Sequence, residues 1–120
     1  MQKVIILGAS DNPERYSNKV LKLLREYGHT VLPVNPRLEE IEGIKTYKTL
    51  EDINEEVDTL TIYINPKISS NLKDSILKVK TKRVIFNPGT ENPSLAEELS
   101  AKGIEVLEAC SLVMLKTGQF

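Results

Sequence analysis

Short apolar runs alternate with amphipathic stretches along the whole chain. The four apolar residues 4–7 predict a strand that is covered on both faces, as in a parallel sheet. Apolar residues then recur at helical spacing over 20–27, and Gly28 supplies a C-terminal cap, so we expect a helix of about ten residues there. Further strands are predicted at residues 31–34, 44–47, 59–64, 84–86 and 104–107.

Three more helices are predicted between these strands. The segment 49–52 has the spacing of a capping box, which indicates a short helix. Apolar positions at helical spacing over 68–79 predict one amphipathic helix, with Pro66 tolerable in its first turn. An Asn-Pro pair at 92–93 opens a helix that Gly103 ends.

The alternation of strands and helices through short connections predicts an α/β fold. We expect a Rossmann-like, doubly wound, mainly parallel sheet of five or six strands with helices on both faces. At 120 residues the chain has the length of one domain, and we predict a single domain over 1–120. Pro33 conflicts locally with a central strand because proline has no N–H to donate to a neighbouring strand. We therefore expect Pro33 at the end of its strand or on a side that forms no hydrogen bonds.

Composition excludes several classes of function. With 40% hydrophobic residues, 28% charged residues and a net charge of −1, the chain shows no sign of disorder or of a basic nucleic-acid surface. Cys110 is the only cysteine, so an intrachain disulfide is impossible and a reducing compartment fits. No apolar run approaches the ~18 residues of a membrane span, and no signal-peptide pattern precedes the first strand. We expect a cytoplasmic protein with neither nucleic-acid nor membrane partners.

The predicted topology brings four loops to one edge of the sheet. In doubly wound sheets, ligands bind beyond the carboxyl ends of the strands, where the strand order reverses. The loops in question contain Gly8, Ala9 and Ser10; Asn35, Pro36 and Arg37; Asn65 and Pro66; and Asn87, Pro88 and Gly89.

The loop of Gly8, Ala9 and Ser10 suits a phosphate. It offers backbone N–H groups, small side chains and a hydroxyl donor, although a plain tight turn also explains a single glycine. An NAD-binding loop has three glycines and enters its helix almost at once. Here the polar residues 11–14 delay the helix, which favours a differently placed phosphate or a different nucleotide.

Asn35 stands where an NAD-binding domain carries the Asp or Glu that accepts from the ribose 2′-hydroxyl. A neutral amide followed by Pro36 and Arg37 suits a phosphate on the ribose instead, as in NADP or the 3′-phosphate of coenzyme A. The alternative for Arg37 is a solvated surface charge. The segment of Asn87, Pro88 and Gly89 also has two interpretations. It is an ordinary turn in which Gly89 adopts positive φ, or Asn87 at the end of its strand binds a ligand.

Residues for catalysis are few. His29, the only histidine, follows a helix-ending glycine and is interpreted as a surface turn residue rather than a general base. Cys110 is interpreted as a small buried residue rather than a reactive thiol. No histidine-rich metal site, nucleophile elbow or P-loop lysine pattern is present. These observations favour a binding module over an enzyme.

The order and spacing of the motifs resemble a known family along nearly the whole chain. The stretches GASDNPERYSNKVLKLLREYGHTVLPVNPR, GIKTYKTLEDI and NPGTENPSLAEELSAKGIEVLEACSLV are similar to small stand-alone CoA-binding domain proteins of bacteria and archaea. The same fold is similar to the CoA-binding domain of succinyl-CoA synthetase α subunits and of ADP-forming acyl-CoA synthetases. Those enzymes carry further domains that do not fit in this chain.

This resemblance implies that coenzyme A is the ligand. It implies that the loop at 8–10 lines the CoA phosphates, and that the segment 35–37 lies by the adenosine ribose and its 3′-phosphate. Beside the phosphates it places Arg15, Asn18 and Lys19, and around the rest of the ligand Asn65, Pro66, Asn87, Pro88 and Gly89.

The end of the chain departs from the family pattern. Relatives commonly carry a Cys followed by a Glu-His pair, whereas here Ser111 stands in the Cys position and Leu115 and Lys116 replace the pair. We predict non-covalent binding of coenzyme A or a short acyl-CoA, in a regulatory, carrier or sensing role. The alternatives are an NADP-dependent oxidoreductase and a partner subunit of an acyl-CoA enzyme, and a homo-oligomer also stays open.

Overall fold

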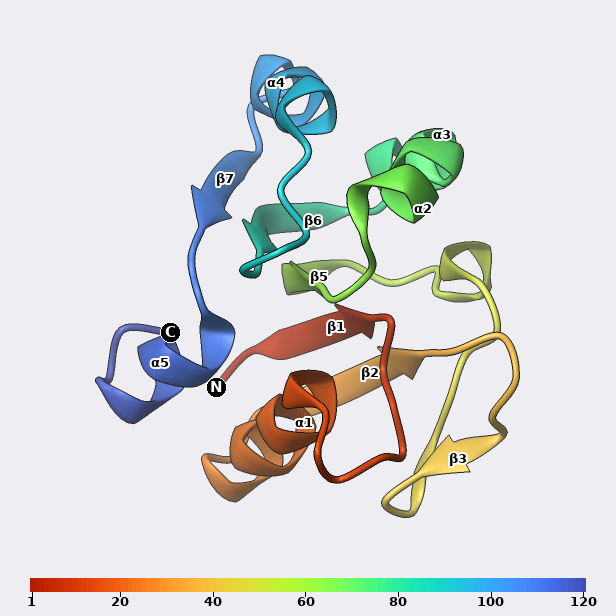
Figure 1. Cartoon of the computed structure of the whole chain (residues 1–120), viewed down its shortest axis with the longest axis vertical. Coiled ribbons are helices and arrows are strands. Elements are labelled where there is room, and N and C mark those ends of the chain that lie inside the picture. Colours follow the sequence, from red (N-terminus) through yellow and green to blue (C-terminus); the bar gives the residue numbers. More distant parts are fainter.

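A five-stranded sheet runs through the centre of the computed structural model, which describes all residues 1–120 (Figure 1). Its order is β2-β1-β5-β6-β7, and every neighbouring pair is parallel. The chain therefore winds outward in two directions from β1, which confirms the predicted doubly wound α/β fold. The strands are β1 (Lys3–Leu7), β2 (Thr30–Val34), β5 (Val57–Ile62), β6 (Thr81–Phe86) and β7 (Glu105–Glu108).

Helices cover both faces of the sheet (Figure 1). On one face lie α1 (Tyr16–Glu26) and α5 (Ser111–Lys116), and on the other lie α2 (Pro66–Asn71), α3 (Lys73–Leu77) and α4 (Pro93–Ala101). A short 3-10 helix, η1 (Leu50–Asp52), precedes β5. No helix of the chain combines the length and the hydrophobicity that crossing a bilayer requires.

Burial of β1 on both faces explains its uninterrupted apolar sequence. Ile5 and Leu7 pack into the cluster that includes Phe86 of β6, whereas Val4 and Ile6 join the cluster on the face covered by α1. These four of the five β1 side chains are at most 3% exposed, and only Lys3 at the start of the strand is exposed. A strand between two helical layers reads as a continuous apolar run because neither of its faces meets water.

The predicted single helix over 68–79 is wrong, because the structure has two short helices there. The backbone of Leu72, with φ −101° and ψ 12°, ends α2 and begins α3. Apolar side chains continue to pack on the sheet across this break, since Leu72 and Ile76 both contact the same core cluster. Hydrophobic spacing therefore carries no signal of the interruption.

The predicted strand over 44–47 is only partly confirmed. Ile44–Lys45 forms β4, which pairs with β3 (Glu40–Ile41) in a separate antiparallel hairpin. The two turn residues between them, Glu42 and Gly43, both have positive φ, as a tight hairpin requires. Helix α5 has no counterpart among the predicted elements.

The conflict at Pro33 is resolved by the place of its strand. β2 is an edge strand of the main sheet, where a missing donor is tolerated. The Pro33 carbonyl still accepts a hydrogen bond from the N–H of Tyr47 at 2.8 Å.

Candidate ligand-binding site

Gly8 forms a close contact at the point where the strand order reverses. Its φ is +91°, and a Cβ there would lie 2.8 Å from Ile64 Cγ2 and 2.9 Å from the Tyr63 carbonyl oxygen. Both the backbone conformation and the close approach therefore require glycine. The N–H groups of Gly8 and Ala9 both donate to the Val34 carbonyl, at 3.2 and 3.1 Å, so neither is free for a ligand. This corrects the expectation that these N–H groups hold a phosphate.

Two asparagines fix the orientation of the same loop. Asn35 Nδ2 donates to the Ala9 carbonyl at 2.8 Å, and Asn18 Nδ2 donates to the Ser10 carbonyl at 2.9 Å. In a trans peptide the following N–H points opposite to the carbonyl, so these bonds also orient the N–H groups of Ser10 and Asp11. Neither N–H has an acceptor within the protein. Two adjacent free N–H groups of this kind can bind an anion.

Asn35 and Asn18 are thus scaffold residues in this structure. Asn35 Oδ1 accepts from the N–H groups of Arg37 and Leu38, at 2.8 and 3.1 Å, which turns the chain directly after β2. Asn18 is completely buried, and its Oδ1 has no hydrogen-bond partner. The sequence predicts that both residues lie near this loop but does not show that their amides bind its backbone.

A pocket of about 680 Å³, here called the β1–β2 pocket, opens beside this loop. Three cationic side chains line it, Arg15, Arg37 and Lys48, and none of them is in an ion pair. Glu51 is the only acidic residue of the lining. The remaining lining residues are Leu7, Gly8, Val34, Asn35, Pro36, Thr49, Leu50, Ile64, Ile68, Leu72 and Ser75.

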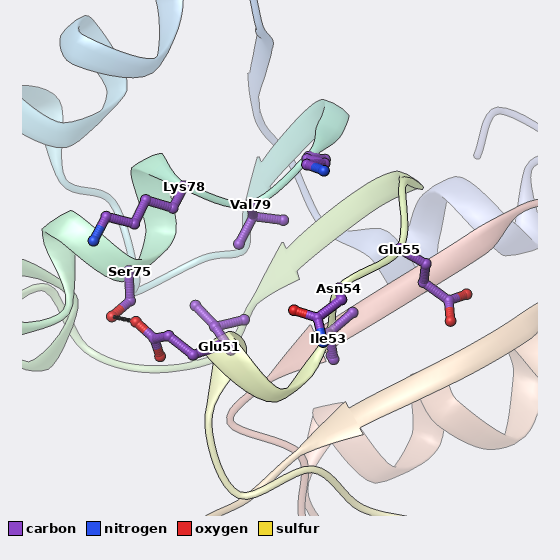
Figure 2. Close-up of a pocket in the computed structure, with 9 residues that line it drawn as sticks. Glu51, Ile53, Asn54, Glu55, Ser75, Lys78 and Val79 are labelled. Atoms are coloured by element: carbon purple, nitrogen blue, oxygen red, sulfur yellow. Dashed lines mark hydrogen bonds between the residues drawn. The ribbon is translucent and has the colours of Figure 1, made fainter.

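The carboxylate of Glu51 is already engaged within the protein. It accepts a hydrogen bond from the Ser75 hydroxyl, as Figure 2 shows from the side of a smaller pocket of about 290 Å³ between η1 and α3. That bond lowers the pKa of Glu51. The lining of the β1–β2 pocket has an excess of positive charge because three cations face one carboxylate, and Glu51 pairs with none of the three.

A second pocket of about 530 Å³, here called the α1–α5 pocket, lies on the other side of the same segments. Arg15 lines the first pocket and Tyr16 the second, while Ile64 lines the first and Tyr63 the second. The pockets therefore adjoin across the start of α1 and the loop after β5. The second pocket has no acidic side chain and is lined by Tyr16, Lys19, Tyr63, Asn87, Pro88, Cys110, Leu112, Val113 and Lys116.

Cys110 and Tyr63 both differ from simple core residues. Cys110 is half-buried and lines the α1–α5 pocket, so its interpretation as a small buried core residue is wrong. The hydroxyl of Tyr63 is buried without a hydrogen-bond partner in the protein. Burial raises the pKa of Tyr63, which therefore stays protonated.

Asn87 is the centre of a buried hydrogen-bond network. Its Nδ2 donates to Thr61 Oγ1 at 2.6 Å and to the Ile62 carbonyl at 2.9 Å, and its Oδ1 accepts from the Ser111 N–H at 2.9 Å. The hydroxyls of Thr61 and Ser111 lie 2.8 Å apart. Asn87 thus joins β5, β6 and the start of α5, where Ser111 contributes its backbone N–H and its hydroxyl.

His29 lies at the opposite edge of the sheet. Its Nδ1 accepts from the Gln2 N–H at 2.9 Å, and its ring lies 5.7 Å from that of Phe120. Burial lowers the pKa of His29, which favours the neutral ring that this acceptor role needs. It is a half-buried structural residue rather than a solvated turn residue, and it contacts neither pocket.

The structure brings some of the predicted residues to the pockets and leaves others outside. Lining the β1–β2 pocket are Gly8, Arg15, Asn35, Pro36 and Arg37, and lining the α1–α5 pocket are Lys19, Asn87 and Pro88. Neither lining includes Ala9, Ser10, Asn18, Asn65, Pro66 or Gly89.

Two of the residues outside the pockets have clear structural roles. Asn65 Oδ1 caps α2 by accepting from the Ile68 N–H at 2.9 Å, and Gly89 has φ +89° in an open turn. Lys48 and Lys116 also line the pockets, although sequence reasoning assigned neither of them to the site. No group of three or more His, Cys, Asp or Glu side chains is placed to hold a metal ion.

Comparisons with known proteins agree with this geometry. The model of a family described as CoA binding domain matches residues 2–116. A similar fold is present in the crystal structure of an uncharacterized protein, with a TM-score of 0.88 and 43% sequence identity. The match covers 100% of this chain and 98% of that protein.

Two curated proteins are also similar to the chain. The ADP-forming acetate–CoA ligase II subunit alpha of Pyrococcus furiosus is 45% identical over 65 residues, which are 53% of this chain and 14% of that subunit. The uncharacterized protein YneT of Bacillus subtilis is 24% identical over 106 residues, which are 88% of this chain and 78% of that protein.

Proposed function

The chain belongs to the CoA binding domain family, and from that premise we propose that it binds coenzyme A or a short acyl-CoA without forming a covalent bond. The observation that carries the proposal is the set of three unpaired cations, Arg15, Arg37 and Lys48, around one pocket. The unit that binds is the whole segment 1–120, because both adjoining pockets combine loops from its two halves.

The β1–β2 pocket suits the nucleotide half of the ligand. Coenzyme A carries a diphosphate and a 3′-phosphate, and guanidinium and ammonium groups are strong partners for such oxyanions. The free N–H groups of Ser10 and Asp11 belong to the loop beside this pocket and are further donors for the phosphates of the ligand. The Ser10 hydroxyl accepts from the Asn12 N–H at 3.0 Å, which leaves its own proton free to donate. Arg37 follows β2 and takes the 3′-phosphate.

The α1–α5 pocket suits the pantetheine half. It is largely apolar and aromatic, with Tyr16, Tyr63, Leu112 and Val113 in its lining. A ligand that crosses the start of α1 can occupy both pockets, because Arg15 and Tyr16 line one each. Binding across the point where the strand order reverses is general for doubly wound sheets.

We infer that such binding serves a regulatory, carrier or sensing role, and the similarity to an acetate–CoA ligase subunit supports an acyl-CoA enzyme as a partner. NADP is the competing ligand, because Arg37 beyond β2 also fits a 2′-phosphate. The two ligands differ in the second pocket, where NADP would place nicotinamide and ribose instead of the pantetheine arm.

Isothermal titration calorimetry with coenzyme A, 3′-dephospho-CoA and NADPH tests the proposal. Coenzyme A should bind about tenfold more tightly than 3′-dephospho-CoA, and Arg37→Ala should remove that difference, because one charge-assisted contact is worth about 1.5–3 kcal/mol. Lys22→Ala is the matched control, since Lys22 pairs with Glu42 at 3.9 Å and lines neither pocket. Tighter binding of NADPH than of coenzyme A would favour the competing ligand.

A further inference from the structure

The α1–α5 pocket holds two cations that are not part of the β1–β2 pocket. Lys19 and Lys116 line it, neither is in an ion pair, and no acidic side chain is part of the lining. We propose that these lysines select acyl-CoA thioesters whose acyl group ends in a carboxylate, that is, thioesters of dicarboxylic acids. This inference rests on the proposed function, because it names the acyl class for the same site.

The position of the lysines separates them from the phosphate-binding side. Lys19 lies one turn along α1 from Arg15, which lines the β1–β2 pocket instead. Lys116 ends α5, a helix that packs against α1. The two ammonium groups therefore belong to the side of the ligand where the acyl group lies, at the far end from the nucleotide.

The rest of the lining explains why the anion would be an acyl carboxylate rather than a free ion. Tyr63, Leu112 and Val113 form apolar and aromatic walls that suit the methylene groups of a short acyl chain. The Lys19 ammonium lies 5.3 Å from the centre of the Tyr16 ring, a contact that holds the cation at the pocket wall. A pocket with apolar walls and unpaired cations suits an acyl group that has methylene groups and a terminal carboxylate.

Calorimetric titrations with coenzyme A, succinyl-CoA and butyryl-CoA test the proposal on the full chain. The two thioesters have four-carbon acyl groups that differ in the terminal carboxylate. At low ionic strength succinyl-CoA should bind about fivefold more tightly than butyryl-CoA, as expected for one partly exposed ion pair. Raising the salt concentration should reduce that ratio, because exposed ion pairs are screened.

Variants assign the effect to the two lysines. Lys19→Ala and Lys116→Ala should each lower the succinyl-to-butyryl ratio, and the double variant should bring it to about one, since each change removes a pairing cation. Lys22→Ala, on the same helix but outside the pocket, should leave the ratio unchanged. All three lysines are exposed, so circular dichroism should report the native fold for each variant.

Equal affinities for succinyl-CoA and butyryl-CoA, together with normal binding of coenzyme A, would overturn this inference and leave the proposed function intact. A ratio that persists in the double variant would also overturn it. Failure of coenzyme A and both thioesters to bind would instead refute the proposed function, and the inference with it.

Discussion

The two edges of the central sheet differ in whether their charged side chains form ion pairs. At the amino edge, Lys3 pairs with Glu55 at 2.9 Å and Lys82 with Asp58 at 3.5 Å. At the carboxyl edge, the cations around the two pockets have no acidic partner in the protein. Because both edges belong to the same strands, the difference is not imposed by the fold.

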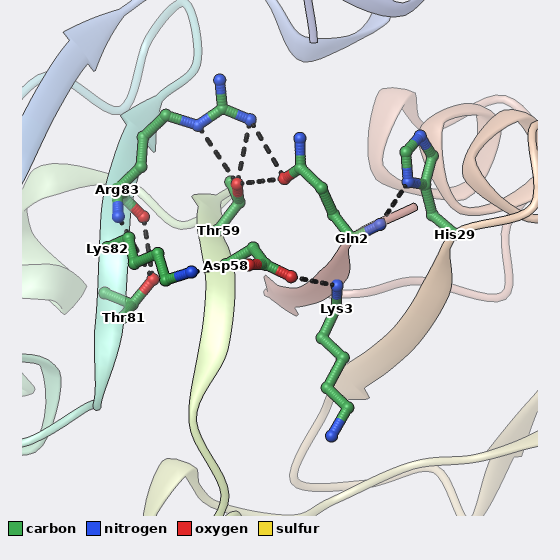
Figure 3. Close-up of polar contacts among 8 residues, drawn as sticks. All are labelled: Gln2, Lys3, His29, Asp58, Thr59, Thr81, Lys82 and Arg83. Carbon is green, nitrogen blue, oxygen red and sulfur yellow. Dashed lines mark hydrogen bonds and ion pairs between the residues drawn. The ribbon is translucent and has the colours of Figure 1, made fainter.

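Hydrogen bonds of the amino edge are also completed within the protein (Figure 3). The buried Thr59 hydroxyl donates to Gln2 Oε1 at 2.7 Å and accepts from Arg83 Nη2 at 2.9 Å. Burial lowers the pKa of Arg83, whose guanidinium lies 4.8 Å from the centre of the Phe120 ring. One edge thus satisfies its polar and charged groups within the fold, while the other leaves donors and cations unpaired.

The largest loss of stability is expected at Asn87. Although it lies at the carboxyl edge, its side-chain hydrogen bonds are completed within the protein, as at the amino edge. Asn87→Ala removes three hydrogen bonds and leaves the Ser111 N–H without its acceptor. We expect the free energy of unfolding to fall by about 2–4 kcal/mol. Urea denaturation measures this loss, and Asn54→Ala, at an exposed amide without a hydrogen bond, should change stability by less than about 0.5 kcal/mol.

Thr59→Val should produce the next largest loss and separate stability from binding. The change removes a buried hydroxyl that Arg83 and Gln2 both use, so the free energy of unfolding should fall by about 1–3 kcal/mol. The affinity for coenzyme A should stay the same, because Thr59 lies at the edge away from both pockets. A parallel loss of affinity in calorimetry would contradict the division between the edges.

Arg37→Ala should have the reverse effect of Thr59→Val. Arg37 is exposed and unpaired, so its removal should change the free energy of unfolding by no more than about 0.5 kcal/mol. Its cost should appear only in calorimetry with coenzyme A, because the charge serves the ligand and not the fold. A clear loss of stability in urea denaturation would show that Arg37 has a structural role.

The smallest effect concerns pH and His29. Because the pKa of His29 is lower in the folded chain than its ordinary value of 6.5, the unfolded chain binds more protons as the pH falls through that value. Stability is therefore complete above about pH 6.5 and is lost as the pH falls through the folded pKa. Urea denaturation from pH 7.5 to pH 5 should show this decline in the native chain. His29→Gln should flatten it, since no other histidine is present.

Sequence patterns predicted the fold well because burial on both faces leaves a direct signature in strands such as β1 and β5. They predicted the edge that carries the β1–β2 pocket because topology alone places the loops after Leu7 and Val34 together. The break between α2 and α3 at Leu72 could not be predicted, because the spacing of apolar residues continues through it unchanged. The helix α5 was missed because its position depends on the contact between Ser111 and Asn87, which lie far apart along the chain.

The site itself was predicted only at the level of loops. The sequence marks Gly8, Asn35 and Arg37 but not which of their groups are free, because that depends on bonds between loops. The Val34 carbonyl takes the N–H groups of Gly8 and Ala9, and this moves the free donors to Ser10 and Asp11. Lys48 lies in a stretch that resembles the family and Lys116 at the divergent end of the chain, but neither pattern predicts a role for the side chain, so only the folded chain shows that they line the pockets.

The central claim is that the unpaired groups of the carboxyl edge hold coenzyme A, and ligand-dependent stability tests it most directly. Urea denaturation of the native chain should be measured with and without coenzyme A at about 100 times its Kd. Binding to the folded state alone should raise the free energy of unfolding by about 2.7 kcal/mol. An unfolding curve that coenzyme A does not move at any concentration up to the millimolar range would contradict the account.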